Sequence, residues 1–487
     1  MKINFLFFYL FLFSVSFTYA QYKDYPQDFL DKEFHKNRRE QLRAKMPKNS
    51  VAVFFANAIR NRSNDVEYNY HQDPNFYYLT GYMEPHALLL VFKEDQTVNN
   101  QVFNEVLFVQ EKNEYVEMWY GKRIGIKGAQ DDLGFRVAFN GSEFSSFELD
   151  FKKMDHILFN QFKNDVRDTE SNVDLFDLIK TFKEKVSYDF SDIKNLKDDK
   201  LYNETKERLD ISSLSSFMAS LREIKTEEEL ILLKKAIDIS AIGQIEIMKA
   251  IYPEMSETEV QGVHEFVYKK YGAEYEGYPS IVGAGGNGCI LHYIENNKVE
   301  VGDWKLVLMD LGAEYHGYTA DVTRTIPANG KFSKEQKIIY DLVYKAQEAG
   351  IEKTKIGNSF SAPDSATRKV INKGLADLGI IKSEKSVHLY YPHESSHHIG
   401  LDVHDVSNYG KLKENMVITV EPGIYIPEGS NCDEKWWGIA VRIEDDILVT
   451  KNGPVNLSGR APRTSDDIEK TMKLPSILSD FNLPELD

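Results

Sequence analysis

Five residues in the C-terminal half of the chain combine types that could bind metal ions. They are four carboxylates and one imidazole: Asp310, Asp321, His397, Glu421 and Glu444. Each lies in a short segment that is typical of a strand or a tight loop, where an unpaired buried charge would be costly. Four anions that converge in one core need cations between them, so the five residues together predict a two-metal hydrolytic site.

The spacing of the two aspartates predicts that they are neighbours across a hairpin. Both lie in strand-like stretches, and Tyr315 and His316 stand between those stretches. A two-residue loop there would set Asp310 directly opposite Asp321, on the same face. Opposed Cβ atoms lie about 4.5–5.5 Å apart, so the pair could span two metal ions roughly 3.5–4 Å apart. The alternative is a turn-flanking Asp and a solvated strand Asp, which the apolar run before Asp310 makes a poor interpretation.

The other three residues come from separate segments. His397 lies in the segment 393–405, which holds four of the chain's 12 histidines. Glu421 follows an apolar run and precedes a Pro-Gly turn, so we expect its carboxylate at the tip of a strand. Glu444 alternates with Arg442, which puts both side chains on one face of a strand. The site must therefore be assembled from segments that are far apart in the chain.

Six motifs in this half carry a resemblance to a known family. They are Asn287-Gly-Cys-Ile-Leu-His292-Tyr, Met309-Asp-Leu-Gly, Tyr318-Thr-Ala-Asp321-Val-Thr-Arg, His397-His-Ile-Gly-Leu-Asp-Val-His404-Asp, Val420-Glu421-Pro-Gly-Ile-Tyr425 and Arg442-Ile-Glu444-Asp-Asp. The chain resembles the Xaa-Pro aminopeptidases (aminopeptidase P), metallopeptidases with the pita-bread fold. All five metal positions hold the expected residue types in the expected order. The stretch 68–85 resembles the N-terminal domain of that family, so the resemblance covers nearly the whole mature chain.

The resemblance implies an α/β (α+β) protein of two domains. A creatinase-like α/β domain, the aminopeptidase P N-terminal domain, would span residues 21–222. A pita-bread catalytic domain with a curved antiparallel sheet and a dinuclear metal site would span residues 223–470, followed by an acidic tail, 471–487. Capping signals at Thr226, Ser256 and Ser333 independently predict helix starts, the first of them at the start of the second domain.

The resemblance also implies roles for the five residues. Asp321 and Glu444 would bridge two divalent metal ions. Asp310 would hold one ion, and His397 with Glu421 would hold the other. A hydroxide between the ions would be the nucleophile, and Glu421 would shuttle its proton. Four oxygen donors and one nitrogen donor suit Mn²⁺, although Co, Fe or Zn could bind.

Further residues would meet the peptide. The resemblance assigns a catalytic role to His404, near the developing oxyanion or the leaving nitrogen, and substrate contacts to His292, His393, Arg442, Tyr425 and Trp119. Arg442 and Tyr425 would also orient the carboxylates. Trp119 resembles a Trp-x-Gly segment that oligomeric members place at the proline pocket of a neighbouring subunit, and a half-buried strand Trp is the alternative. Glu394 stands where family members often have Gly, which bears on the shape of the pocket.

The function expected from this resemblance is hydrolysis of the N-terminal Xaa-Pro bond. Peptides with proline at position two would be the partners, and the first residue would be released. Xaa-Pro dipeptidase (prolidase) is the alternative enzyme. A non-catalytic or creatinase-like relative is less favoured, because such relatives lose metal ligands and this chain keeps all five. The resemblance of Trp119 favours a homo-oligomer, a dimer or a tetramer.

Composition and the first residues bear on partners and location. The 487 residues carry a formal net charge of −17, which argues against nucleic-acid binding. Residues 1–20 are typical of a signal peptide, because Lys2 precedes an apolar run that is too short to span a bilayer and ends at a small-residue cleavage site, Ala20. We therefore expect export, to the periplasm or the medium, and no membrane span after cleavage. Two cysteines, Cys289 and Cys432, make no disulfide framework.

Overall fold

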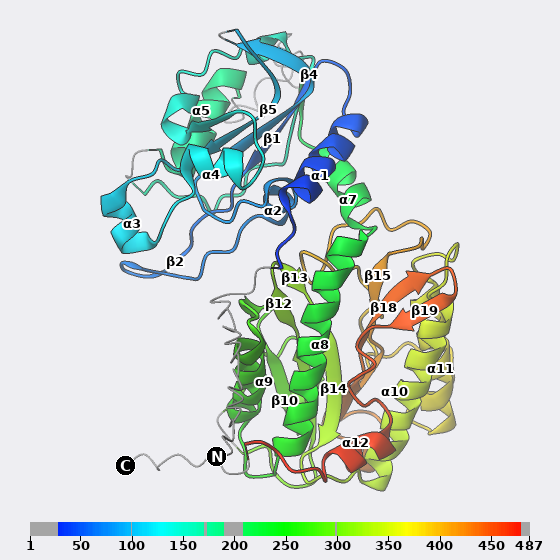
Figure 1. The fold of residues 1–487 in the computed structure, drawn as a ribbon. Coiled ribbons are helices and arrows are strands. Elements are labelled where there is room, and N and C mark those ends of the chain that lie inside the picture. The colour runs from blue at the N-terminus through cyan, green and yellow to red at the C-terminus, as the bar shows by residue number, and fades with distance from the viewer. Residues whose placement is uncertain (1–27, 99, 170–172, 189–207, 298–299, 479–487) are drawn as a thin grey trace, which may run out of the picture.

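The computed structural model describes residues 28–98, 100–169, 173–188, 208–297 and 300–478, which form two domains (Figure 1). The expected signal peptide, residues 1–20, lies outside the described residues, and so does the end of the expected acidic tail. Within the described ranges, no helix combines the length and the apolar character needed to cross a membrane.

A mixed sheet of six strands forms the centre of the N-terminal domain, in the order β6-β5-β4-β1-β7-β8. The strands are β1 (Ser50–Phe55), β4 (Leu88–Val98), β5 (Gln101–Val109), β6 (Ala138–Asn140), β7 (His156–Phe159) and β8 (Leu209–Asp210). Successive residues of β1 enter different cores. Val51 packs in the cluster that holds Phe182, and Ala52 packs in the cluster that holds Leu42. Both faces of β1 are therefore buried, which explains its unbroken apolar run.

Helices and one small hairpin surround this sheet. The helices are α1 (Lys32–Lys45), α2 (Pro74–Thr80), α3 (Glu114–Tyr120), α4 (Gly125–Asp131), α5 (Leu175–Val186) and α7 (Ser213–Arg222), and the hairpin pairs β2 (Asn61–Ser63) with β3 (Val66–Glu67). The interpretation of Trp119 as a half-buried strand residue is wrong. Trp119 lies on α3 and is 67% exposed, because this short helix buries no residue against the domain.

Helices on two sides frame the second domain (Figure 1). They are α8 (Glu227–Ala250), α9 (Glu257–Tyr271), α10 (Lys334–Lys353), α11 (Ala362–Asp377) and the short α12 (Ser465–Thr471). The predicted starts of three helices are confirmed: Thr226, Ser256 and Ser333 each head a capping box. In each box, side chains satisfy backbone N–H groups that the first helical turn leaves free, so the sequence defines where these helices begin.

Antiparallel strands form four small sheets in the second domain (Figure 1). They are β9 (Tyr275–Glu276), β10 (Ile281–Ala284), β11 (Leu306–Leu311), β12 (Ala313–Tyr315), β13 (Tyr318–Thr319), β14 (Val322–Pro327), β15 (Val417–Val420), β16 (Gly423–Ile426), β17 (Ile439–Arg442), β18 (Asp445–Thr450) and β19 (Gly453–Asn456). Every residue of β11, β14, β15 and β17 is buried. Carboxylates at the ends of these strands therefore face a protein core.

The hairpin that carries the two aspartates has a different register from the predicted one. Tyr315 pairs with Tyr318, so the two-residue loop is His316-Gly317, with positive φ angles of 51° and 83°. Such loops need positive φ at both positions, which Gly317 adopts easily, whereas Tyr315 belongs to the buried core. The prediction that Asp310 directly opposes Asp321 is therefore wrong.

The observed register sets Asp310 opposite Thr323. Asp321 comes two residues earlier than Thr323, so it lies diagonally across from Asp310 on the same face of the hairpin. The expectation that both aspartates reach one site thus survives the change of register, because a shift by an even number of residues keeps side chains on the same face.

Candidate metal centre

One pocket of the second domain, of about 420 Å³, brings the candidate residues together. All five predicted metal ligands line it: Asp310, Asp321, His397, Glu421 and Glu444. Its other lining residues are Leu291, His292, His393, Glu394, Ser396, His404, Tyr409 and Arg442. Every motif that the sequence singled out in this domain thus contributes to a single concave site.

Strand ends position the five side chains. Asp310 lies in β11, and Asp321 precedes β14. Glu421 follows β15 directly, as predicted, and Glu444 lies between β17 and β18. His397 is held against β15, because its carbonyl accepts a hydrogen bond of 2.9 Å from the Thr419 N–H.

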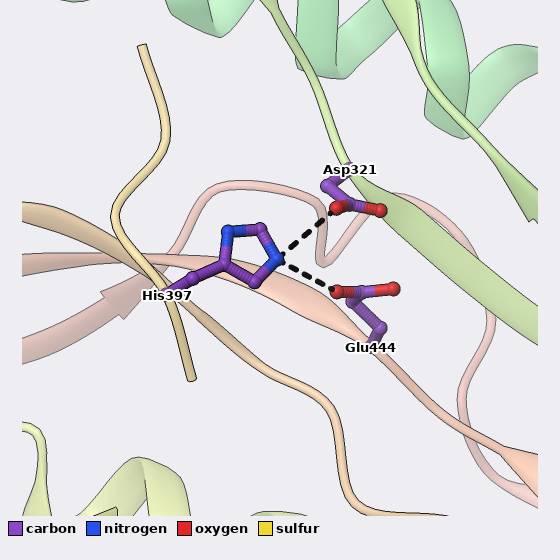
Figure 2. Close-up of side chains that lie close together, drawn as sticks. All are labelled: Asp321, His397 and Glu444. Atoms are coloured by element: carbon purple, nitrogen blue, oxygen red, sulfur yellow. Dashed lines mark ion pairs between the residues drawn. The ribbon is translucent and has the colours of Figure 1, made fainter. Parts of the chain in front are cut away.

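Three of these side chains already form a cluster suited to a cation. Figure 2 shows the imidazole of His397 pointing between the carboxylates of Asp321 and Glu444. Its Nε2 lies 3.3 Å from Asp321 Oδ2 and 4.0 Å from Glu444 Oε1. One donor atom from each residue falls within 4.8 Å of the others. Glu421 completes the group, with Oε1 at 3.5 Å from His397 Nε2.

The fifth side chain, Asp310, is tied to Asp321 by a residue that the sequence did not predict. The hydroxyl oxygen of Tyr278 lies 2.6 Å from a carboxylate oxygen of each aspartate. On its other side, the Arg442 guanidinium donates a hydrogen bond to Asp310. Tyr278 and Arg442 therefore fix the orientation of Asp310 from opposite sides, as supporting residues do in metal sites.

Thr323 is a second supporting residue that sequence reasoning missed. Its hydroxyl donates to Glu444 Oε2 over 2.6 Å and accepts from Arg442 Nε over 3.3 Å. A signal was present in the sequence, because Thr323 comes two residues after Asp321 and alternation along a strand puts both side chains on one face. No comparable local pattern marks Tyr278, which precedes β10.

Burial and mutual repulsion make the negative charges of this site unfavourable. Burial raises the pKa of Glu421 to about 7, and that of Glu444 well above its usual range. The pKa of Asp310 is raised as well, by burial and by the nearby Asp321. Burial also disfavours the imidazolium of His397, but Asp321 and Glu421 outweigh it and raise its pKa to about 9. A divalent cation would relieve this repulsion, so the residues present fit a metal site.

This electrostatic state predicts how metal affinity depends on pH. A metal ion must displace the proton that Glu421 holds below pH 7 and the proton that His397 holds below pH 9. Affinity should therefore weaken as the pH falls, by about tenfold per pH unit for each proton displaced. Titration of the metal-free protein with Mn²⁺ between pH 6 and pH 8 measures the slope. Glu421→Gln should make it shallower, and a pH-independent affinity in the wild type would contradict the assignment.

Hydrogen bonds define the orientation of His393. Burial and the charge of Arg442 lower its pKa to about 3, so the ring is neutral. Its Nδ1–H donates to the backbone carbonyl of Glu394 over 2.8 Å, and its Nε2 accepts from the Tyr425 hydroxyl over 2.8 Å. The Tyr425 oxygen in turn accepts from Arg442 Nη1 over 2.9 Å. The chain of donors from Arg442 to Glu394 therefore allows only one tautomer of His393.

Two of the predicted substrate contacts lie outside this pocket. Tyr425 does not line the pocket: it is 2% exposed, and its hydroxyl is hydrogen-bonded to His393 and Arg442, which it orients. Trp119 does not line the pocket either, since α3 belongs to the N-terminal domain. His292 and His404, by contrast, are exposed at the mouth of the pocket.

A buried ion-pair cluster fixes the loop that carries His404. The adjacent Asp405 pairs with Arg222 and with Lys225, whose Nζ lies 2.9 Å away, and all three side chains are at most 3% exposed. Burial opposes the charge on Asp405, but the two cations outweigh it and keep the pKa below its usual range. Because Arg222 and Lys225 lie where α7 leads into α8, the junction of the domains positions His404. The ring of His404 packs edge-on against His397, with centroids 4.4 Å apart.

Comparisons with known proteins agree with this architecture. Residues 35–157 match the aminopeptidase P N-terminal domain, and residues 231–451 match metallopeptidase family M24. The Xaa-Pro aminopeptidase of Haemophilus influenzae is 34% identical over 458 residues, which cover 91% of this chain and 98% of the relative. The Xaa-Pro aminopeptidase of Escherichia coli is 33% identical over 471 residues, with the same two shares.

A solved structure extends the likeness to three dimensions. Aminopeptidase P from Escherichia coli with the inhibitor Pro-Leu has a TM-score of 0.79 and 32% identity, and the match covers 91% of this chain and 98% of that one. The fold and the metal-binding cluster therefore define a metal-dependent hydrolase, an M24 metallopeptidase of pita-bread fold with a separate N-terminal domain. More narrowly, the chain belongs to the Xaa-Pro aminopeptidase (aminopeptidase P) family. The predicted fold class is confirmed.

Proposed function

We propose that this protein hydrolyses the N-terminal Xaa-Pro bond of peptides and releases the first residue. The observation that carries the proposal is the convergence of all five metal-binding side chains in one pocket, in a chain that is 34% identical to a known Xaa-Pro aminopeptidase. The inhibitor Pro-Leu of the Escherichia coli relative begins with proline, as the second product of such a cleavage does. The likeness extends over both domains, which supports an enzyme with the same arrangement of parts.

The same pocket supports a proposal about the cofactor: two divalent ions, with Mn²⁺ as the preferred metal. Four carboxylates and one imidazole suit this hard cation. Asp321 and Glu444 would be shared by both ions, Asp310 would hold one, and His397 with Glu421 would hold the other. When bound, the ions would lower the pKa of a water molecule and polarise the peptide carbonyl.

The protein's own groups would then handle the protons. Glu421 would take the proton of the attacking water and pass it to the leaving nitrogen. That nitrogen needs a proton, because it must leave as a neutral amine when the C–N bond breaks. His404 and His292, exposed at the mouth of the pocket, would contact the developing oxyanion and the substrate. The neutral ring of His393, fixed by Tyr425, would border the proline ring.

His404→Ala should lower the rate of turnover by about 10²-fold or more while the metal content stays the same. The physical reason is that His404 packs on His397 but is proposed to act on substrate and not on metal. Steady-state kinetics together with elemental analysis of the purified variant check both parts. A variant that loses its metal would show that His404 is a ligand.

The choice of peptide tests the proposed function. We expect the metal-loaded enzyme to cleave Ala-Pro-Ala and longer peptides with proline second, with the free first residue as product. Matched peptides with alanine second, and peptides with an acetylated amino terminus, should resist cleavage. Mass spectrometry of the products distinguishes the outcomes. Cleavage confined to Xaa-Pro dipeptides would instead assign the protein to the Xaa-Pro dipeptidases.

Export and oligomer formation are further proposals that rest on the sequence. The signal-like segment 1–20 supports export to the periplasm or the medium, with a mature protein that begins at Gln21. N-terminal sequencing of protein from the natural host tests this, and an intact Met1 would rule it out. The exposed Trp119 supports a homo-oligomer, a dimer or a tetramer, which light scattering measures.

A further inference from the structure

A carboxylate at the mouth of the catalytic pocket has no role in the proposed chemistry. Glu394 lines the pocket with an exposed side chain. Ser395, its neighbour, points the other way: it is 0% exposed, and its N–H donates to Asp364. Ser396 lines the pocket again. This alternation along an extended segment sets the carboxylate of Glu394 on the pocket side.

The carboxylate of Glu394 is also without a protein cation. Among the described residues, it accepts no hydrogen bond and makes no ion pair. Two arginines are near this segment, but each pairs with another carboxylate. Arg442 pairs with Asp310, and Arg368 pairs with Asp364 over 2.7 Å. Glu394 therefore presents a free negative charge to whatever enters the pocket.

The remaining charges of the site leave this anion unbalanced. The four other carboxylates of the pocket would be matched by two divalent ions, as proposed above. Glu394 would then give the mouth a negative potential, within a protein whose formal net charge is already −17. An unpaired carboxylate at the rim of a pocket attracts a cationic group of the ligand and disfavours an anionic one.

We propose that Glu394 selects peptides that carry a lysine or arginine side chain next to the N-terminal Xaa-Pro dipeptide. This inference rests on the proposed function. We place the cationic residue after proline, because Glu394 directly follows His393, which would border the proline ring. The contact between Glu394 and the cationic side chain would be an exposed ion pair, so it should raise kcat/KM by about two- to fivefold.

Four tetrapeptides test the inference: Ala-Pro-Lys-Ala and Lys-Pro-Ala-Ala, each against the same peptide with norleucine in place of lysine. Norleucine keeps the length of the side chain and removes its charge. We expect kcat/KM to favour lysine over norleucine at the third position by about two- to fivefold in the wild type, and by less at high salt. In Glu394→Gln, the two peptides of this pair should be cleaved with equal kcat/KM. Glu428→Gln, which removes an exposed carboxylate outside the pocket, should keep it.

Each outcome has one meaning. An equal ratio in the wild type and Glu394→Gln would overturn the inference. So would a loss of the same factor for all four peptides, because Glu394 would then bind the α-ammonium group that they share. A preference confined to the first position would overturn the placement after proline. Failure of the wild type to cleave any of the four would instead refute the proposed function.

Discussion

Glu421→Gln should lower kcat for Ala-Pro-Ala by about 10²–10⁴-fold while the protein still binds metal. The amide keeps an oxygen that can contact a cation, but it cannot accept a proton from water. Glu421 lies at the end of β15, with Oε1 at 3.5 Å from His397 Nε2, so its carboxylate borders both the cluster and the open pocket. Steady-state kinetics with parallel elemental analysis provides the measurement.

Asp321→Asn is the matched comparison, because Asp321 belongs to the same cluster but has no proposed role in proton transfer. That variant should lose metal and activity together. If Glu421→Gln also loses its metal, the carboxylate of Glu421 is essential for metal binding, and the fall in kcat follows from the lost ion and not from lost proton transfer. A Glu421→Gln enzyme with nearly normal kcat would contradict both roles.

Arg324→Met should destabilise the second domain by about 3–5 kcal/mol, seen as a fall in Tm of roughly 6–20 °C. Arg324 and Asp445 are both 0% exposed and pair over 2.7 Å. The guanidinium also donates to the backbone carbonyls of Glu444, Pro462 and Ala461. Removal of Arg324 leaves Asp445 buried with a weaker ion-pair partner and leaves those carbonyls without a hydrogen-bond donor. The loss of folding free energy should therefore be large. Calorimetry measures it.

The control for this variant is Arg460→Met. Arg460 lies 3.8 Å from Asp238, and both side chains are 56% exposed, so water screens the pair. We expect a change of at most about 0.5 kcal/mol. If the two variants lower Tm equally, the buried pair of Arg324 and Asp445 does not hold in place the strand ends that carry Glu444.

The candidate ligands could be predicted from the sequence because each lies in a local motif. Apolar runs define the strands, and carboxylates at their ends stand out against them, as at Glu421 after β15. Capping boxes defined the starts of α8, α9 and α10 for the same reason, since the signal spans only four residues. Features of this kind need no knowledge of the rest of the fold.

Contacts between distant segments were harder to predict. Tyr278 lies beside Asp310 and Asp321, but a lone tyrosine carries no sign of such neighbours. The register of the aspartate hairpin depended on which two residues adopt positive φ, and burial of Tyr315 in the core decided it. Tyr425 has a residue type that suits a substrate contact, yet its hydroxyl is used to orient His393 and Arg442.

Removal and return of metal tests the central claim most directly. The purified protein would be stripped by exhaustive chelation, and Mn²⁺ would then be added stepwise while bound ions and release of alanine from Ala-Pro-Ala are both measured. We expect no activity in the stripped protein, full recovery with two ions per chain, and no recovery in Asp321→Asn. Activity that persists after metal falls below one-tenth of an ion per chain would contradict the account.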